Sequence, residues 1–325
     1  MNDILIIRNN PKDFVGKIVS NRGYQIMSPY IRDHNITFRW LRRMHFRLNF
    51  PKSIIWFNRD IEKVVVNTII IFESLISKQF LKWLRTVQPN ARIIIWYWNI
   101  VDNTLNPKLI KDKSIEKWSF SRKDSLMYGM KFNPAPYFKE ILLQSEEPVY
   151  DIVFVGKDKG RLKNILAYQK KFEKLGMSTK FIITPENKWK SNRKYHKPIP
   201  YSDVLKLTSK SKAIFDFIEI TDSGQSMRVY ESLFNQKKLI TNNQLIVDYD
   251  FYDKKNIFIL NIDNIEGLKS FVNSPYKKIS KETVMNYDFE NWINRFFIKD
   301  EKLLNMMSSC KLKEVIKSKS KKEVM

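Results

Sequence analysis

Short apolar runs alternate with amphipathic stretches along most of the chain, and this alternation predicts an α/β protein. The first run, Ile4–Ile7, is continuous and apolar, which is typical of a parallel strand buried on both faces. The loop after it, through Gly16 and Gly23, is polar and interrupted by glycine, so no element is expected there. Further strands are predicted at 64–72, 92–98 and 118–121, with helices at 76–87 and 124–130.

A second series of strands and helices begins at Tyr150, after a stiff, linker-like break at Asn133–Pro136. Its expected strands lie at 151–155, 180–183, 213–220, 239–240 and 256–260. Its expected helices run through Lys174, over 201–207, from Ser226 onward and over 265–272. Strands that alternate with helices in this way predict two doubly wound, Rossmann-like domains, at residues 1–140 and 141–285.

The end of the chain has a different pattern. An aromatic helix is predicted within residues 286–310, because Tyr287, Phe289, Trp292 and Phe296 recur at helical spacing. The last segment, 311–325, contains six lysines and two glutamates. It has too few apolar residues to fold alone, so we expect a basic tail.

One stretch combines strand, glycine turn, helix and strand. Gly224 follows the apolar run 213–220, and Ser226 is positioned to cap the next helix. A helix that begins at the carboxyl end of a parallel strand presents an anion-binding N-terminus. Arg228 lies in its first turn, where the helix dipole disfavours a cation, which predicts an anionic ligand or a carboxylate partner. Glu231, three residues on, is one such partner.

A second candidate is the loop Gly156–Arg161, which joins the first strand of the second domain to its helix. Its two glycines allow close approach of the backbone to a phosphate, and Lys157, Lys159 and Arg161 add positive charge. The spacing matches neither a Walker A loop nor a dinucleotide-binding motif. A solvated basic turn is therefore an equally open interpretation of this loop by itself.

The segment Gly224–Asn243 resembles the donor-binding motif of GT-B glycosyltransferases, particularly those that build lipopolysaccharide core and capsule. In that family a Gly-polar-polar-x-Arg-x-x-Glu segment precedes a Lys-x-Ile-Thr-x-Asn strand. The matching residues here are Gly224, Gln225, Ser226, Arg228 and Glu231, then Lys238, Ile240, Thr241 and Asn243. The resemblance implies that Gln225, Ser226 and Arg228 face a donor diphosphate. It also implies that Glu231 accepts hydrogen bonds from ribose. The alternative is an ordinary α/β unit with a surface Arg–Glu pair.

The resemblance extends to other parts of the chain. It implies that the Gly156–Arg161 loop faces a cleft between the two domains and that the helix in 286–310 packs back on the first domain. It places the nucleotide base near Ile199 and Tyr201, although Tyr201 packed on its own helix is an equal alternative. It implies a donor of the UDP type and no bound metal. Stabilisation of the departing diphosphate, the role of a metal, then falls to Arg228, the lysines and the helix dipole.

Sugar transfer with inversion needs a base for the acceptor proton, which we expect from the first domain. The candidates are Glu73 and Asp102, at carboxyl ends of strands, and Asp33 and His34, in a loop. Spacing favours none of them, and each is equally typical of a cap or a surface charge. Retaining members of the family often carry two glutamates eight residues apart, whereas Ser223 precedes Glu231 by that distance. This departure favours inversion.

Composition limits the partners. The 325 residues include 58 Lys and Arg against 34 Asp and Glu, a net charge of +24, which indicates an anionic partner. Part of this excess is also compatible with a compositional bias towards lysine. A single cysteine, Cys310, fits a reducing cytosol, and three scattered histidines argue against a zinc site. No apolar run is long enough to predict a transmembrane helix.

The stretch Tyr30–Phe50 interleaves arginines with aromatic residues, and Phe38, Leu41, His45 and Leu48 share one helical face. It predicts either a packed helix with solvated arginines or a surface for anionic lipid or a lipid-linked acceptor. With the basic tail, it favours peripheral attachment to the cytoplasmic face of the membrane.

Together these observations favour a hexosyltransferase that moves a sugar from a nucleotide-sugar donor to a lipid-linked or core oligosaccharide of a bacterial surface glycan. The alternative is a basic nucleic-acid-binding or scaffold protein, although no RNA-binding signature accompanies the arginines. The donor sugar, the acceptor and the oligomeric state are not determined by the sequence.

Overall fold

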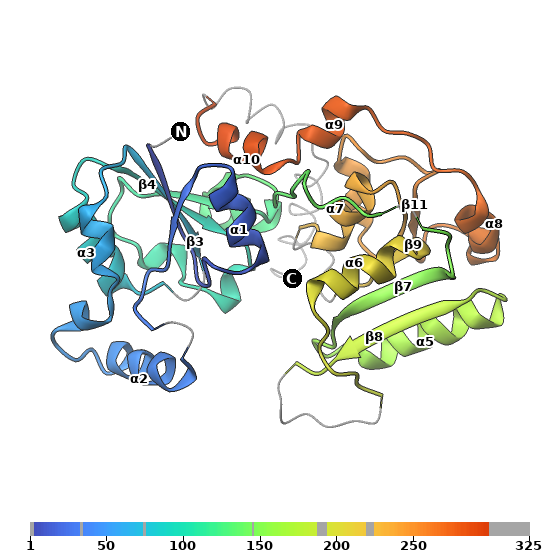
Figure 1. Ribbon diagram of the computed structural model, residues 1–325, viewed down its shortest axis with the longest axis horizontal. Helices are drawn as coiled ribbons and strands as arrows, with labels where there is room; N and C mark the ends of the chain where they lie inside the picture. Colours follow the sequence, from blue (N-terminus) through green and yellow to red (C-terminus); the bar gives the residue numbers. More distant parts are fainter. Residues whose placement is uncertain are drawn as a thin grey trace, which may run out of the picture. The chain divides into compact units, whose positions relative to one another are not determined.

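The computed structural model describes residues 3–32, 35–73, 76–144, 146–186, 194–218 and 224–298. The chain packs as two compact units, Met1–Pro134 and Ala135–Met325, and the break between them falls in the predicted stiff segment (Figure 1). Each unit contains a parallel sheet flanked by helices. The α/β class with two doubly wound sheets is therefore confirmed.

The first unit is built on a sheet in the order β2-β1-β3-β4-β5-β6, in which every neighbouring pair is parallel. Its strands are β1 (Ile4–Ile7), β2 (Gln25–Met27), β3 (Thr68–Glu73), β4 (Arg92–Tyr97), β5 (Glu116–Ser119) and β6 (Lys131–Phe132). Its α-helices are α1 (Phe14–Asn21), α2 (Ile36–Arg47), α3 (Lys78–Val87) and α4 (Arg122–Tyr128).

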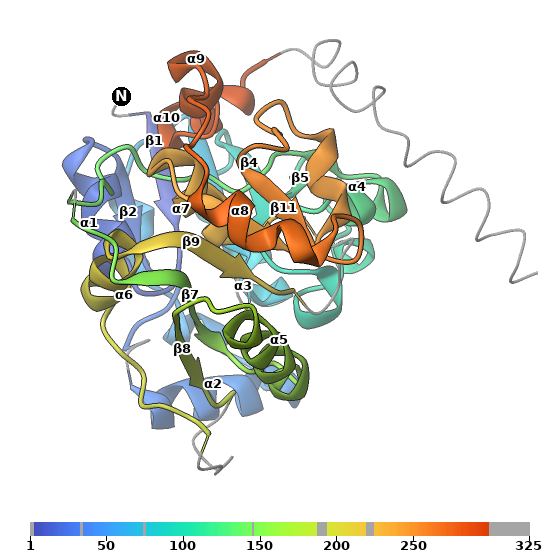
Figure 2. The ribbon, with the colours of Figure 1, turned by 90° about the vertical axis from the view of Figure 1, so that its right-hand side faces the viewer.

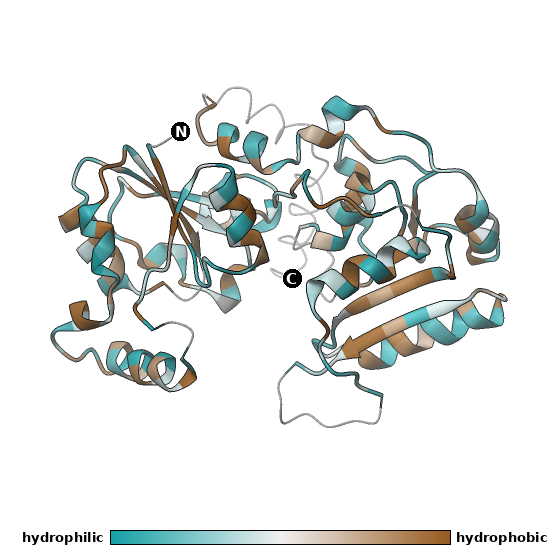
Figure 3. Ribbon diagram, viewed as in Figure 1, coloured by the Kyte–Doolittle hydropathy of each residue, from teal (hydrophilic) through white to brown (hydrophobic). Residues whose placement is uncertain are grey.

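Alternate residues of β1, β3 and β4 form one face of this sheet and pack under α3 in a continuous core. Phe80 and Leu84 of α3 are fully buried against Ile71 and Ile95 of the strands. The hydropathy colouring in Figure 3 shows the strands of both sheets as the apolar centre of each unit.

The expectation of a loop after β1 is wrong. Residues Phe14–Asn21 form α1, and Gln25–Met27 form β2 at the edge of the sheet. Asp13 caps α1 by accepting a hydrogen bond from the backbone N–H of Gly16 (2.8 Å). The cap and the apolar residues after it were a usable signal, but the helix is only eight residues long and contains a glycine, which weakens the periodic pattern.

The second unit has the strand order β11-β10-β9-β7-β8, again parallel throughout. Its strands are β7 (Tyr150–Lys157), β8 (Thr179–Thr184), β9 (Ser211–Asp216), β10 (Lys238–Thr241) and β11 (Ile257–Ile259). Its α-helices are α5 (Leu162–Lys174), α6 (Tyr201–Ser209), α7 (Met227–Phe234), α8 (Leu268–Asn273), α9 (Lys281–Met285) and α10 (Phe289–Arg295).

Helices cover both faces of this second sheet. α5 and α8 contribute Phe172 and Leu268 to a core with Phe154 and Phe215 of the strands, so they share one face. α6 and α7 lie on the opposite face (Figure 2). The helix after β7 and the helices after β8 and β9 are thus on different sides of the sheet, which is the mark of a doubly wound fold.

Both units reverse direction at the same place in their strand order. In the first unit β1 lies between β2 and β3, and in the second β7 lies between β8 and β9. Chains that leave such neighbouring strands turn to opposite faces of the sheet and open a crevice at the carboxyl ends. A ligand site is therefore expected between the ends of β7 and β9.

The C-terminal aromatic helix is present as α10, and Phe289 stacks on Phe138 of the same unit (5.3 Å between ring centroids). Backbone hydrogen bonds also join Tyr137 to Tyr287 and Phe289 (2.8 Å each). Packing of this helix on the first unit stays a prediction. Residues 299–310 and the basic tail 311–325 lie outside the described residues. Within the described part of the chain, no helix is long and apolar enough to span a membrane.

Candidate functional site

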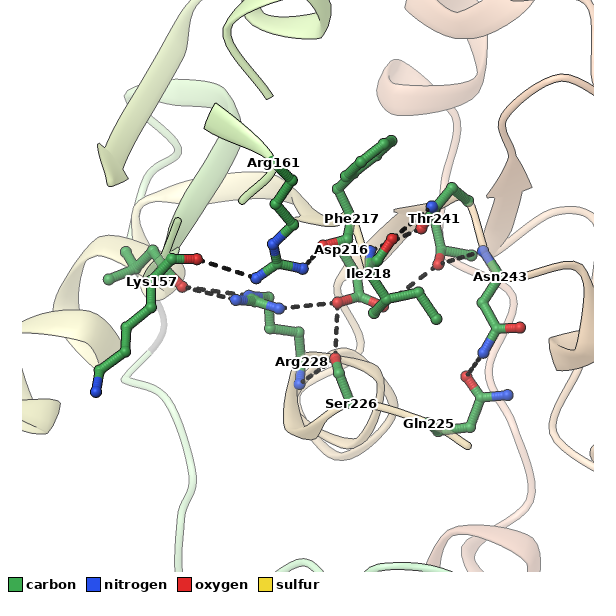
Figure 4. A network of polar contacts seen from close by, with 12 residues as sticks. Lys157, Arg161, Asp216, Phe217, Ile218, Gln225, Ser226, Arg228, Thr241 and Asn243 are labelled. Atoms are coloured by element: carbon green, nitrogen blue, oxygen red, sulfur yellow. Dashed lines mark hydrogen bonds and ion pairs between the residues drawn. The ribbon is translucent and has the colours of Figure 1, made fainter. Parts of the chain in front are cut away.

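The predicted helix cap at Ser226 is confirmed. Ser226 has an extended backbone and is the N-cap of α7, where its Oγ accepts from the backbone N–H of Arg228 (3.2 Å). The same hydroxyl donates to Oδ1 of Asp216 at the end of β9 (2.7 Å; Figure 4). One serine therefore begins the helix and ties its first turn to the neighbouring strand.

Asp216 is the centre of the site. It is fully buried, and its Oδ1 accepts from Ser226 and from Nη1 of Arg228 (2.9 Å). Its Oδ2 accepts from the hydroxyl of Thr241 at the end of β10 (3.3 Å). A carboxylate without solvent needs such donors, because an unpaired buried charge is costly. Asp216 thereby holds together the ends of two strands and the start of α7.

Arg228 reaches from α7 across the end of β9 to β7. Its Nε and Nη2 donate to the carbonyl of Val155 in β7 (3.2 and 3.1 Å), and its guanidinium carbon lies 4.8 Å from the Phe154 ring centroid. It passes directly over Gly156, where an added Cβ would lie 2.3 Å from Nη2. The side chain is 17% exposed, and these bonds use three of its five N–H groups. The remaining two have no acceptor among the described residues.

Arg161 bridges the same two strands in a different way. Its side chain donates to the carbonyls of Asp158 and Lys157 (3.1 Å each) and of Phe217, just beyond β9. Oδ1 of Asp158 in turn accepts from the backbone N–H of Leu162, the first residue of α5 (2.6 Å). Arg161 is buried and therefore fixes the loop in place. The Lys157 side chain points away from this network in Figure 4.

The N-terminus of α7 carries unused donors. Gly224 has a φ of 100°, a conformation that favours glycine, and its carbonyl accepts from Asn243 (3.3 Å). Asn243 also donates to Oε1 of Gln225 (3.2 Å), but Nε2 of Gln225 is buried with no acceptor among the described residues. The backbone N–H groups of Gln225, Ser226 and Met227 likewise meet no acceptor in the described part of the chain. Such convergent N–H groups form an anion site.

Glu231, one turn further along α7, faces a different group. Its Oε1 accepts from the hydroxyl of Tyr201 (2.8 Å), which lies 3.5 Å from the hydroxyl of Tyr137. Burial raises the pKa of the Glu231 carboxyl, and the hydrogen bond from Tyr201 opposes that shift. Burial, and then the charge of Glu231, raises the pKa of the Tyr201 hydroxyl, so Tyr201 is the donor. No described residue donates to Oε2 of Glu231.

The anticipated Arg228–Glu231 ion pair is therefore not formed. Arg228 pairs with Asp216 across the strand, and Glu231 pairs with Tyr201 of α6. This separation leaves N–H donors at the start of α7 and a carboxylate acceptor one turn later. The arrangement can bind an anionic group and, beside it, a group that carries hydroxyls.

Comparisons with known proteins were made for the whole chain. No protein-family model and no curated protein sequence matches it. A solved structure that resembles it is the crystal structure of a glycosyltransferase from Rickettsia africae ESF-5. The two chains share 11% sequence identity with a TM-score of 0.44, over 94% of this chain and 90% of that chain. A resemblance this weak does not assign a function.

The structure brings many of the predicted donor-site residues to the carboxyl edge of the second sheet. Gly156 and Arg228 are in close approach, and Ser226 joins them through Asp216. Lys159 has a left-handed backbone (φ 47°) in the turn before α5. Ile199 is half-buried in the segment that leads to α6. Whether these residues bind a donor stays a prediction.

The candidate bases of the first unit fall into different environments. Glu73 is fully buried at the end of β3, and its Oε1 accepts from the backbone N–H of Leu105 (3.2 Å), which fixes the loop after β4. Asp102 is exposed in the turn after β4 and has no ion pair or hydrogen bond to a described residue. Asp33 and His34 lie outside the described residues. Asp102 is thus the accessible carboxylate of the two described candidates.

Asp216, at the centre of the site, was missed in the sequence. Asp216 is one of two acidic residues in the apolar run 213–220, together with Glu219, and a carboxylate in the middle of such a run was a usable signal for a paired buried charge. Asn243 was identified as the last residue of the motif, but its contacts were not: its amide donates to the carbonyl of Gly224 and to Oε1 of Gln225. Among the described residues, no group of three His, Cys, Asp or Glu side chains is placed to hold a metal ion.

Proposed function

We propose that the protein is a glycosyltransferase that moves a hexosyl group from a nucleotide-sugar donor, of the UDP type, to a bacterial surface glycan of the lipopolysaccharide or capsule kind. The observation that carries the proposal is the set of unused N–H donors at the start of α7. They belong to Gln225, Ser226 and Met227, with Nε2 of Gln225 beside them. A diphosphate offers the acceptors that these groups lack.

The position of Glu231 supports a nucleotide rather than a simple anion. Its Oε2 is available to accept hydrogen bonds from the ribose hydroxyls, one helical turn beyond the diphosphate. Tyr201 fixes the carboxylate through Oε1 and borders the segment with Ile199 that we propose for the base. Charge that develops on the departing diphosphate is stabilised by the two remaining N–H groups of Arg228 and by the dipole of α7. In this mechanism, these groups perform the role that a metal ion has in other transferases.

The acceptor hydroxyl requires a base, for which we propose Asp102. It is an exposed carboxylate at the carboxyl end of a strand in the first unit. A single displacement by the activated hydroxyl inverts the configuration at the sugar carbon, and the acceptor proton passes to Asp102. Asp33 and His34 are the further candidates from the sequence.

Isothermal calorimetry with UDP in the absence of magnesium tests this proposal. We expect binding in the micromolar-to-millimolar range, and Ser226→Ala and Gln225→Ala should each weaken it. The parallel titration uses a short DNA duplex, the ligand expected for the nucleic-acid-binding alternative. Binding of the duplex without binding of UDP would reject the proposal. If UDP binds, a panel of sugar nucleotides in a thermal-shift assay would define the donor.

A further inference from the structure

The helix α2 and the segment after it combine basic side chains with exposed apolar side chains. Residues 35–58 contain five basic side chains and no Asp or Glu; the basic residues are Arg39, Arg42, Arg43, Arg47 and Lys52. Figure 1 places α2 outside the sheet of the first unit, below α3 in that view. Figure 3 shows apolar and polar residues interleaved along it.

The inner side of α2 is used for packing. Arg42 is buried with its guanidinium 3.9 Å from the Tyr30 ring centroid, and Phe38 contacts Trp56 edge-on (6.4 Å between centroids). Nε2 of His45 lies 2.9 Å from the carbonyl of Pro51. The predicted face of Phe38, Leu41, His45 and Leu48 is therefore divided. Phe38 and His45 turn inward, whereas Leu41 and Leu48 are exposed.

The outer side of α2 and the turn after it make a surface that we call the α2 outer surface. Its members are all exposed: Ile36, Trp40, Leu41, Arg43, Arg47, Leu48, Phe50, Ile54 and Ile55. Ile36 is 67% exposed and Trp40 59% exposed, and helical spacing puts them on the same line as Arg43 and Arg47. Exposed apolar side chains gathered in this way mark an interaction site rather than chance exposure.

An open groove continues this surface towards α3. It has a volume of about 400 Å³ and lies between the segment 49–54 and the helix, with Lys52 and Lys82 on its two walls. Phe50, Ile54 and Trp83 supply its apolar lining. The groove therefore joins positive charge to apolar surface, as the outer side of α2 does.

We propose that the α2 outer surface docks on an anionic lipid bilayer. Trp40, Leu41 and Ile36 enter the boundary between headgroups and acyl chains, while Arg43 and Arg47 pair with lipid phosphates. Charge complementarity selects this occupant, because the surface combines two cations, Arg43 and Arg47, with apolar side chains and has no carboxylate among its members. A nucleic acid would need the cations but would leave Ile36 and Leu41 without a partner.

Docking of this kind is shallow and reversible. Each Lys or Arg near an anionic leaflet contributes about 1 kcal/mol, and salt screens the attraction beyond the Debye length. The inference concerns attachment and does not depend on the proposed sugar transfer, since binding to lipid is measured without donor or acceptor. It places the protein at a membrane surface where a lipid-linked substrate would be found.

Co-sedimentation of the full-length protein with vesicles tests the proposal. Vesicles of phosphatidylglycerol and phosphatidylcholine should bind the protein, and vesicles of phosphatidylcholine alone should bind it weakly. The double variant Arg43→Gln/Arg47→Gln should reduce the partition coefficient about 30-fold, the value for two charges at about 1 kcal/mol each. The double variant Trp40→Ser/Leu41→Ser should reduce it about tenfold and keep its salt dependence.

Matched variants control for charge and hydrophobicity alone. Lys163→Gln/Lys170→Gln removes two exposed cations from α5, and Leu126→Ser/Met127→Ser removes two exposed apolar side chains from α4. Both should partition within about twofold of the unaltered protein. Equal losses in the α2 and control variants would overturn the proposal, because the tail or net charge would then account for binding. It would also be overturned if the protein stayed in the supernatant with anionic vesicles at low salt. Equally tight binding to a DNA duplex, unaffected by Trp40→Ser/Leu41→Ser, would do the same.

Discussion

An arginine paired with an aspartate lies beside the point where the strand order reverses in each sheet. The two pairs differ in which of their two side chains is exposed to solvent. In the first unit Arg8 follows β1, and its side chain is 9% exposed while that of Asp13 is 41% exposed. In the second unit the side chain of Asp216 is fully buried, and that of Arg228 is 17% exposed. The accessible member is a carboxylate in one case and a cation in the other.

This difference follows from where each aspartate stands in the chain. Asp13 is in the loop before α1, where it caps the helix and forms a bidentate pair with Arg8 (3.1 and 2.9 Å). Asp216 is the last residue of a central strand, so neighbours surround it and its charge is directed inward. Among the described residues, the same strand order thus presents a partly exposed cation at the edge of one sheet and an exposed carboxylate at the edge of the other. Strand order fixes where a site lies, whereas the charge at the strand end determines what it binds.

The largest expected effect comes from removing the buried carboxylate. Asp216→Ala leaves the charge of Arg228 and the hydroxyls of Ser226 and Thr241 without their acceptor, at a cost of about 3–5 kcal/mol in free energy of unfolding. Asp13→Ala should cost about 1–2 kcal/mol, because water replaces the exposed carboxylate and mainly a helix cap is lost. Urea denaturation measures both.

Calorimetry with UDP sharpens this comparison. Asp216→Ala should abolish detectable binding, because Arg228 and the start of α7 lose their common anchor, whereas Asp13→Ala should leave the affinity unchanged. If Asp13→Ala lowered stability and UDP binding as much as Asp216→Ala, the Arg8–Asp13 and Arg228–Asp216 pairs would have equivalent roles. That result would contradict our interpretation.

The next effect concerns turnover and the first unit. Asp102→Asn should lower the rate of UDP release from a bound sugar nucleotide about 100-fold, or about 2.7 kcal/mol, through loss of the base. The affinity for UDP should not change. Glu73→Gln is the comparison, because Glu73 is buried and fixes a loop; it should alter stability more than turnover. Full turnover in Asp102→Asn would return the role of base to Asp33 or His34.

Glu231→Gln should weaken UDP binding by about 1.5–2 kcal/mol, roughly 10–30-fold, through loss of a charged acceptor for ribose. The substitution keeps the shape of the side chain and an oxygen for Tyr201, so the fold should be retained. Unchanged affinity would leave Glu231 with a structural role only, as a partner of Tyr201.

The same variant tests the environment of the carboxyl group. Burial raises the pKa of Glu231 in the folded protein, so the folded state retains a proton that the unfolded state has released. Between the ordinary value of 4.5 and the raised value, the unaltered protein should lose stability as the pH rises. Glu231→Gln should lack this loss. Parallel unfolding curves for the two proteins across that range would contradict the assignment.

Local patterns were sufficient to predict the elements of the site. The cap at Ser226 and the start of α7 were evident from the glycine turn and the helical spacing after it, because both depend on residues close in sequence. The strand and turn at Gly156 were evident for the same reason. The loop predicted in place of α1 was wrong because a short helix with a glycine in its first turn gives a weak signal.

The polar partners could not be predicted from local patterns. Arg228 had a nearby acid at Glu231 in the sequence, but Asp216 is its partner because the first turn of α7 lies beside the end of β9, where Ser226 also donates to Asp216. Tyr201 and Glu231 meet only because α6 and α7 cover the same face of the sheet. Such contacts depend on tertiary structure. A single sequence therefore indicates which polar residues are candidates for the site, but not which of them contact one another.

The smallest effect separates close approach from backbone flexibility at two glycines. A Cβ at Gly156 would lie 2.3 Å from Nη2 of Arg228, whereas a Cβ at Gly267 would meet nothing within 4 Å. Both Gly→Ala substitutions restrict the unfolded chain equally and so favour folding by a few tenths of a kcal/mol or more. Only Gly156→Ala must displace the guanidinium from the crevice, so it should weaken UDP binding about fivefold, or about 1 kcal/mol, with no loss of the fold. Calorimetry and a thermal melt of both variants provide the measurement. If Gly156→Ala bound UDP as tightly as Gly267→Ala, the observed position of Arg228 over β7 would have no part in donor binding, and the anion site would consist of the α7 N-terminus alone.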